Sequence, residues 1–137
     1  MCFQHFQKKY KLKLAKSSIP GAGLGLFTTA RFPPGKRIGP YKGNIVDRDN
    51  FDPSTNPYGI ARSDGKIVDA QSTQSCIARY ANDCRKRDKD NKRCKGNNAI
   101  LEEKSDKKIV LRAKRNTKNG ILKGREVFAS YGNEYWA

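Results

Sequence analysis

The sequence predicts a mostly β domain made of several small sheets with one short helix. Short apolar runs rich in β-branched and aromatic residues recur along the 137-residue chain, and such runs favour strands. Glycine, proline and Asp-Gly signals separate these runs at close intervals. One segment alone places its apolar residues at helical spacing. A chain of this length predicts a single domain.

The first elements surround a glycine-rich stretch. Lys11–Leu14 alternates polar and apolar residues, as a half-buried strand does. In Gly21–Phe27, three glycines at alternate positions let the backbone approach a ligand and present its N–H and C=O groups. A glycine-rich turn leading into an edge strand is the alternative. The spacing differs from the dinucleotide-binding pattern, because the third glycine comes too early and no long helix follows.

The middle of the chain predicts a kinked pair of strands followed by a hairpin. Pro33-Pro34-Gly35 predicts a turn, and residues 47–57 predict a polar loop with two prolines. An Asp-Gly pair at Asp64-Gly65 lies between apolar runs, which is a hairpin signal. The strands expected here are Arg37–Tyr41, Gly43–Val46, Tyr58–Ala61 and Lys66–Asp69.

The second half predicts the helix, a second hairpin and a closing strand. Ser72–Tyr80 carries apolar residues at helical spacing, with Ser72 or Thr73 as the expected N-cap. Residues 85–97 predict a basic loop and residues 116–123 an irregular segment. The expected strands are Ala99–Leu101, Lys108–Leu111 and Val127–Ala129.

The formal net charge of +16 is concentrated in three stretches. Lys8–Lys16 and Arg85–Lys95 each carry +5, and Lys104–Lys118 carries +6. A single charged run is usually a solvated face, but three uncompensated runs predict contact with a polyanion such as DNA, RNA or a nucleosome. Because no nucleic-acid-reading motif accompanies them, the expected contact is with phosphates and is not sequence-specific.

The four cysteines and single histidine predict neither a metal site nor a histidine-based catalytic triad. Cys2, Cys76, Cys84 and Cys94 contain no C-x-x-C pair, and reduced thiols are the expectation. The only histidine, His5, lies near the N-terminus. The N-terminus lacks the pattern of a signal peptide, and no apolar run is long enough to span a membrane. An intracellular setting follows from these observations.

Several short motifs follow one another in an order that identifies a family resemblance. They are Pro20–Phe27, Tyr41-Lys42-Gly43, Asp69-Ala70, Arg79–Cys84, Asn98 and Gly124–Trp136. From about Lys11 to its end, the chain resembles the SET domain family of protein lysine methyltransferases. The likeness is greatest to the minimal SET domains, including viral ones, that lack cysteine-rich zinc flanks.

The resemblance implies a β-clip of several small sheets with a C-terminal pseudoknot, in which the chain end lies beneath a loop. It implies an N-terminal extension over residues 1–10 and a SET domain over residues 11–137, with a basic insertion at about residues 85–97. Tyr131 would then lie against Asn82.

The resemblance also implies roles for individual residues. Tyr131 is expected to be catalytic, and Tyr41 to line the channel of the substrate lysine. The residues expected to bind S-adenosylmethionine are Ala22, Gly23, Leu24, Asn82, Asp83 and Trp136. The alternatives are that Tyr131 and Tyr41 are ordinary core tyrosines and that Asn82 merely ends a helix.

The sequence departs from the family pattern at four places. Asp83 replaces the usual histidine, and Arg125 replaces the first of two acids of which Glu126 remains. The link over residues 85–97 is longer than usual, which leaves the match of Asn98 open. Ala129 occupies a position where a larger aromatic residue often limits methylation, so the channel is expected to permit di- or trimethylation.

The implied activity is a protein lysine methyltransferase with a histone or nucleosome as the leading substrate and the nucleus as the expected location. The alternative is a degenerate SET domain that binds a nucleic acid or protein partner without turnover. The retained Tyr131 and Asn82 favour the enzyme, whereas Asp83 and the high positive charge leave room for the binding module.

Overall fold

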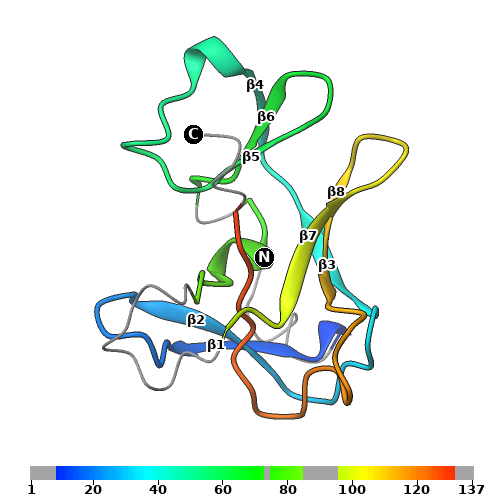
Figure 1. The fold of residues 1–137 in the computed structure, drawn as a ribbon. Coiled ribbons are helices and arrows are strands. Elements are labelled where there is room, and N and C mark those ends of the chain that lie inside the picture. The colour runs from blue at the N-terminus through cyan, green and yellow to red at the C-terminus, as the bar shows by residue number, and fades with distance from the viewer. Residues whose placement is uncertain (1–8, 73–74, 85–95, 132–137) are drawn as a thin grey trace.

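The computed structural model describes residues 9–72, 75–84 and 96–131, which form three small antiparallel sheets (Figure 1). The first pairs β1 (Leu12–Lys16) with β2 (Leu24–Thr28). The second has the order β3 (Arg37–Tyr41), β8 (Ile109–Ala113), β7 (Ala99–Glu103), and the third has the order β4 (Asn44–Asp47), β6 (Lys66–Asp69), β5 (Gly59–Ala61). The prediction of a mostly β fold built from small sheets is confirmed.

Both predicted hairpins form, and the glycine-rich stretch leads into a strand. β5 and β6 pair across the turn that contains Gly65, whose φ of +81° favours glycine. β7 and β8 pair from Ala99 opposite Ala113 to Glu103 opposite Ile109. The second half of Gly21–Phe27 lies in β2, which is the alternative expected for this stretch.

The chain passes from the second sheet to the third at the kink between β3 and β4. A Cβ atom added to Gly43 would lie 2.1 Å from the backbone oxygen of Asp69, so only glycine fits this crossing. β3 pairs with β8, whereas β4 pairs with β6. The two sheets therefore join at the end of β3, where Tyr41 lies.

The helical content is smaller than predicted and differently capped. Within the helix expected over Ser72–Tyr80, Thr73 and residue 74 lie outside the described residues, and the described part contains one 3₁₀ turn, η2 (Ile77–Tyr80), whose N-cap is Cys76 with no side-chain cap. The predicted cap at Ser72 is therefore wrong: its carbonyl closes a separate turn by accepting from Ser75 N at 3.0 Å. A second 3₁₀ turn, η1 (Arg48–Asn50), lies in the predicted loop.

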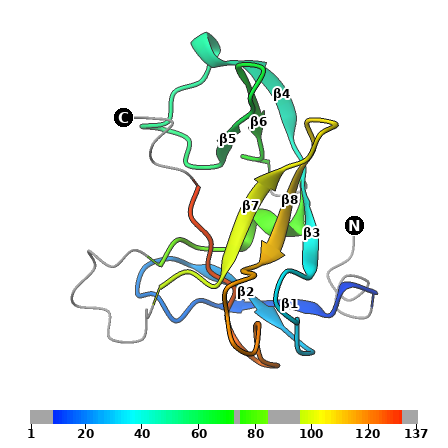
Figure 2. The same cartoon turned by 45° about the vertical axis from the view of Figure 1, so that its right-hand side comes forward.

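The closing segment, residues 126–129, is extended but forms no continuous strand, contrary to the prediction for Val127–Ala129. Glu126 bridges to Phe27, Phe128 to Asn82 and Ala129 to Ala99. Because these partners belong to three different parts of the chain, no single ladder can form. Figures 1 and 2 show the segment running through the middle of the fold, between β2 and β7.

The core gathers around this closing segment. Leu12, Leu26, Leu111 and Val127 are completely buried, and they come from β1, β2, β8 and the closing segment. Burying one such side chain contributes about 1.5–3 kcal/mol. No helix among the described residues is long and apolar enough to cross a bilayer.

Candidate active site

The Tyr131 hydroxyl faces the backbone of η2 and the residue that follows it. It lies 3.2 Å from the carbonyl oxygen of Arg79 and still closer to that of Ala81, and it can donate to either. Burial raises the pKa of Tyr131 well above its usual value. The hydroxyl is therefore neutral at physiological pH and forms a cluster of three oxygen atoms with the two carbonyls.

Tyr41, at the end of β3, packs against the ring of Tyr131. Its ring centroid is 5.9 Å from that of Tyr131, with 56° between the ring planes. Its hydroxyl donates to the carbonyl oxygen of Tyr58 at 2.8 Å, and the residue is 2% exposed. Burial and then the neighbouring Tyr131 raise the pKa of Tyr41, so the Tyr41 hydroxyl is neutral as well.

Arg79 brings a buried positive charge to the site, which the sequence reasoning did not single out. Its Nε donates to Ala70 O at 2.8 Å and its Nη2 to Gln71 O at 3.0 Å. The guanidinium carbon lies 4.0 Å from the ring centroid of Tyr58 and 4.8 Å from that of Tyr80. Carbonyl oxygens and aromatic faces thus hold this cation.

Asn82 joins the glycine-rich stretch to the closing segment. Its Nδ2 donates to Leu24 O at 3.1 Å and lies 3.5 Å from Glu126 Oε2. The two amide protons of Asn82 therefore face Leu24 O and Glu126 Oε2. The amide oxygen Oδ1, for which no bond is found among the described residues, remains as an acceptor at the edge of the site.

Glu126 is a buried carboxylate whose hydrogen-bond donors are all neutral. It accepts from Ser17 Oγ at 2.6 Å, from Ser18 N at 2.9 Å and from Ser18 Oγ at 2.7 Å. A Cβ atom added to Gly25 would lie 2.4 Å from Glu126 Oε2. The close approach that Gly25 permits is therefore to this carboxylate, and Glu126 holds the segment before β2 beside Asn82.

Asn98 fastens the closing segment from the other side. Its Nδ2 donates to Glu126 O at 2.9 Å, and its Oδ1 accepts from Phe128 N at 2.9 Å. Ala129 N donates to Asn82 O at 2.9 Å. The closing segment is thus bonded to Asn82 on one side and to Asn98 on the other, which places Tyr131 next to Asn82.

Asp83 lines a pocket with Tyr131, and both Asp83 and Cys84 are bonded to Asn97. Asp83 Oδ1 accepts from Asn97 Nδ2 at 3.1 Å, and Cys84 N donates to Asn97 Oδ1 at 2.8 Å. Cys76 is a free thiol, but Cys84 is disulfide-bonded, so the expectation of reduced thiols is wrong for Cys84. A disulfide depends on two cysteines meeting in space, which their spacing in sequence does not show.

Two pockets meet at Tyr131. One, of about 300 Å³, lies between the loop at residues 53–59 and the residues from Arg79 to Asp83. The other, of about 270 Å³, lies between β5 and β7 and includes Ser130. Tyr131 lines both pockets, so it lies between the Asn82 side of the site and the β5 side.

The remaining residues expected to take part lie in different settings. Ala22 is half-buried and Gly23 is exposed, while the Leu24 side chain is 47% exposed beside Asn82. Ala129 is completely buried beside Ala99, and neither Ala129 nor Tyr41, the two residues expected to line the lysine channel, lines a pocket at Tyr131. Trp136, Lys8 and the basic stretch at 85–95 lie outside the described residues.

Comparison with known proteins links this geometry to one family. A family model described as the SET domain matches residues 23–132. The fold is similar to ctPRC2 in an autoinhibited conformation bound to S-adenosylmethionine, with a TM-score of 0.67 and 20% identity over 90% of this chain and 15% of that chain. It is also similar to the methyltransferase domain of human PR domain-containing protein 2, with a TM-score of 0.68 and 18% identity over 93% of this chain and 82% of that chain. No curated protein matches the sequence.

Proposed function

Because this chain belongs to the SET domain family, as the match over residues 23–132 shows, we propose that it is an S-adenosylmethionine-dependent protein lysine N-methyltransferase. The observation that carries the proposal is the cluster of the Tyr131 hydroxyl with the carbonyl oxygens of Arg79 and Ala81. All three residues line the pocket on the Asn82 side, and Tyr131 also lines the pocket on the β5 side. Oxygen atoms stabilise a methyl group that carries positive charge during transfer.

The residues around Asn82 fit S-adenosylmethionine, which supplies an activated methyl group on a sulfonium when bound. The free acceptor Asn82 Oδ1 suits the ammonium of its amino-acid end. Glu126 adds a negative charge behind Asn82 that no cation among the described residues neutralises by an ion pair. The backbone of Ala22, Gly23 and Leu24 lies beside them, and Leu24 presents exposed apolar surface.

The second reactant is a neutral lysine, and the pair of tyrosines Tyr41 and Tyr131 favours its neutral form. A free lysine has a pKa of about 10.4 and must lose its proton before it can attack. Desolvation in the pocket beside Tyr131, whose ring packs on Tyr41, lowers that pKa, and the buried Arg79 guanidinium also disfavours a second positive charge. The attacking nitrogen must lie in line with the methyl–sulfur bond, so orientation by the Tyr131 hydroxyl contributes to the rate.

Radiolabel transfer tests the proposal directly. Wild-type protein incubated with labelled S-adenosylmethionine and a mixed protein extract should label at least one protein, whereas Tyr131→Phe should not. Tyr10→Phe, at the other end of the chain, is the matched control and should retain labelling. If wild-type protein labels nothing and the cofactor does not raise its melting temperature, the alternative of a binding module without turnover is favoured.

The proposed substrate is a histone, presented on a nucleosome in the nucleus. The net charge of +16 would repel a free lysine-rich tail, but it would attract the DNA of a nucleosome. Methylation of nucleosomes should therefore exceed methylation of tail peptides and should fall as salt is raised. Equal rates on the peptide and the nucleosome would remove the argument for nucleosomal docking.

A further inference from the structure

A groove of about 550 Å³ lies between the tip of the β5–β6 hairpin and the tip of the β7–β8 hairpin. Of the residues placed in the active site, Tyr41 alone lines it. Its floor is apolar and includes the half-buried Pro40, with Val68 and Val110, 4% and 2% exposed, beneath it. The side chain of Ile45, which also lines the groove, is 52% exposed. The structure thus presents apolar surface in a hollow outside the active site.

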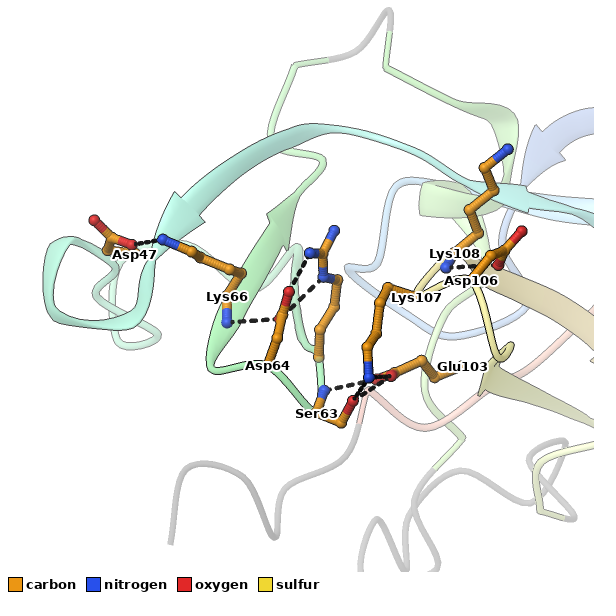
Figure 3. Close-up of polar contacts among 9 residues, drawn as sticks. Asp47, Ser63, Asp64, Lys66, Glu103, Asp106, Lys107 and Lys108 are labelled. Atoms are coloured by element: carbon orange, nitrogen blue, oxygen red, sulfur yellow. Dashed lines mark hydrogen bonds and ion pairs between the residues drawn. The ribbon is translucent and has the colours of Figure 1, made fainter.

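The two hairpin tips are bonded to each other, so the groove is preformed. Ser63 donates to Glu103 through its backbone N–H at 2.7 Å and through its hydroxyl at 2.5 Å. Lys107 Nζ donates to Ser63 Oγ at 2.8 Å and lies 3.8 Å from Glu103 (Figure 3). A groove whose walls are already fixed loses little conformational freedom when it binds a partner.

The acidic residues near the groove are engaged with partners, which leaves its rim positive. Asp64 pairs with Arg62 and Asp47 with Lys66 (Figure 3), while Glu103 is bonded to Ser63. No hydrogen bond or ion pair among the described residues engages the side chains of four further basic residues that line the groove, namely Arg37, Lys42, Lys104 and Lys108.

One acid, Asp106, belongs to the groove and does not cancel this charge. The backbone N–H of Lys108, followed by the charges of Lys104 and Lys108, lowers the pKa of Asp106 below its usual value. Asp106 is therefore ionised at neutral pH, a single negative charge beside the positive side chains of the rim. The groove combines a cationic rim with an apolar floor.

We propose that this groove docks an acidic segment of a partner protein that carries an apolar residue among its carboxylates. The rim cations match the carboxylates, and Ile45 with the half-buried Pro40 matches the apolar side chain. The phosphates of a nucleic acid would match the rim cations, but its backbone has no apolar group to match Ile45. Tyr41, the one aromatic residue in the lining, is 2% exposed and offers no surface on which a base could stack.

Fluorescence anisotropy on the whole protein tests the proposal with three probes. The probes are a labelled peptide of alternating glutamate and leucine, the same peptide with serine at each leucine, and a labelled DNA duplex. The glutamate–leucine peptide should bind most tightly, and its binding should weaken as salt is raised. The variants are Lys104→Glu with Lys108→Glu, to reverse the rim charge, and Ile45→Ser, to remove the apolar contact.

Each variant has a matched control outside the groove. Lys118→Glu with Lys123→Glu makes the same change of net charge, and Leu122→Ser removes a side chain that is also exposed, by 43%. We expect the rim variant and Ile45→Ser each to weaken binding of the glutamate–leucine peptide at least tenfold, and the controls to change it less than threefold. Circular dichroism confirms that the variants, all at exposed positions, are folded.

Three results would contradict the proposal. If the charge control weakens peptide binding as much as the rim variant, the attraction belongs to the whole surface and not to the groove. If the duplex binds more tightly than the glutamate–leucine peptide, and only duplex binding depends on Lys104 and Lys108, the groove is a nucleic-acid site. Equal binding of the leucine and serine peptides would contradict the role of Ile45.

Discussion

Replacing Glu126 with glutamine should both destabilise the protein and weaken its binding of S-adenosylmethionine. The substitution keeps the shape of the side chain but converts one acceptor oxygen into an amide that can only donate. Ser17 Oγ at 2.6 Å and Asn82 Nδ2 at 3.5 Å both face Oε2, whereas Oε1 receives both bonds from Ser18. In either orientation, the NH₂ group of the glutamine faces a nitrogen that can only donate, which is Asn82 Nδ2 on one side and Ser18 N on the other. The substitution also removes the negative charge of Glu126 beside Asn82.

The magnitude follows from these contacts. A hydrogen bond to a charged group contributes about 1.5–3 kcal/mol, and a buried polar group left unsatisfied costs about 1–3 kcal/mol. We therefore expect a loss of about 2–3 kcal/mol in the free energy of unfolding. At an unfolding entropy of about 2.1 cal/mol/K per residue, this lowers the melting temperature by about 7–10 °C. Loss of the fixed Asn82 orientation should weaken cofactor affinity by about tenfold, or about 1.4 kcal/mol.

Urea unfolding measures the stability and calorimetric titration the affinity for the cofactor. Glu103→Gln is the matched control, because Glu103 also accepts from a serine N–H and a serine hydroxyl but lies near the surface and far along the chain from Asn82. The control should lose less than about 1 kcal/mol and bind the cofactor normally. If Glu126→Gln behaves like Glu103→Gln in both measurements, the reasoning about Glu126 is refuted.

Three further predictions follow from the same region. Gly25→Ala should lower the free energy of unfolding by about 1–3 kcal/mol because its Cβ would lie 2.4 Å from Glu126. The control is Gly39→Ala, whose Cβ would meet nothing within 4 Å and which should cost less in the same urea titration. Asn98→Ala should cost about 2 kcal/mol by removing bonds to Glu126 O and Phe128 N; a loss under about 0.5 kcal/mol would contradict the role of Asn98. The family resemblance, in which a larger residue at the position of Ala129 limits methylation, predicts di- or trimethyl-lysine as the product, and mass spectrometry that finds monomethyl-lysine alone would contradict this prediction.

Local signals were sufficient to predict much of the fold. The Asp64-Gly65 pair favours a turn with a positive φ, and Gly65 adopts one at +81°. Short apolar runs beside each turn predicted the strands of both hairpins, and residues of these runs such as Ile60, Ile67 and Val110 are buried in the structure. These features depend on neighbours in sequence, which is why a single sequence contains them.

The closing segment was harder to predict because its contacts are distant in sequence. Val127–Ala129 has the composition of a strand. However, Glu126 bridges to Phe27, and the next two bridges join Phe128 to Asn82 and Ala129 to Ala99. Nothing in a local pattern shows that a segment will pass between three others. The bond from Ser17 to Glu126, across 109 residues, is of the same kind.

The candidate site was only partly accessible from sequence for a related reason. Family resemblance pointed to Tyr131 and Asn82, which the fold brings together. Arg79, Ser17 and Ser18 were not singled out, because each acts through backbone carbonyls or through Glu126 and has no pattern of its own. The disulfide at Cys84 could likewise not be predicted, because the spacing of cysteines in sequence does not show which thiols meet in space.

The most direct test of the central claim is the single-turnover rate of methyl transfer by Tyr131→Phe, measured with saturating S-adenosylmethionine and a substrate that the wild-type protein labels. The substitution removes the hydroxyl from the oxygen cluster with Arg79 and Ala81 but keeps the ring against Tyr41. The account predicts a rate lower by about a hundredfold or more, with cofactor affinity within about threefold of the wild type. A Tyr131→Phe protein that transfers methyl groups at the wild-type rate would contradict it.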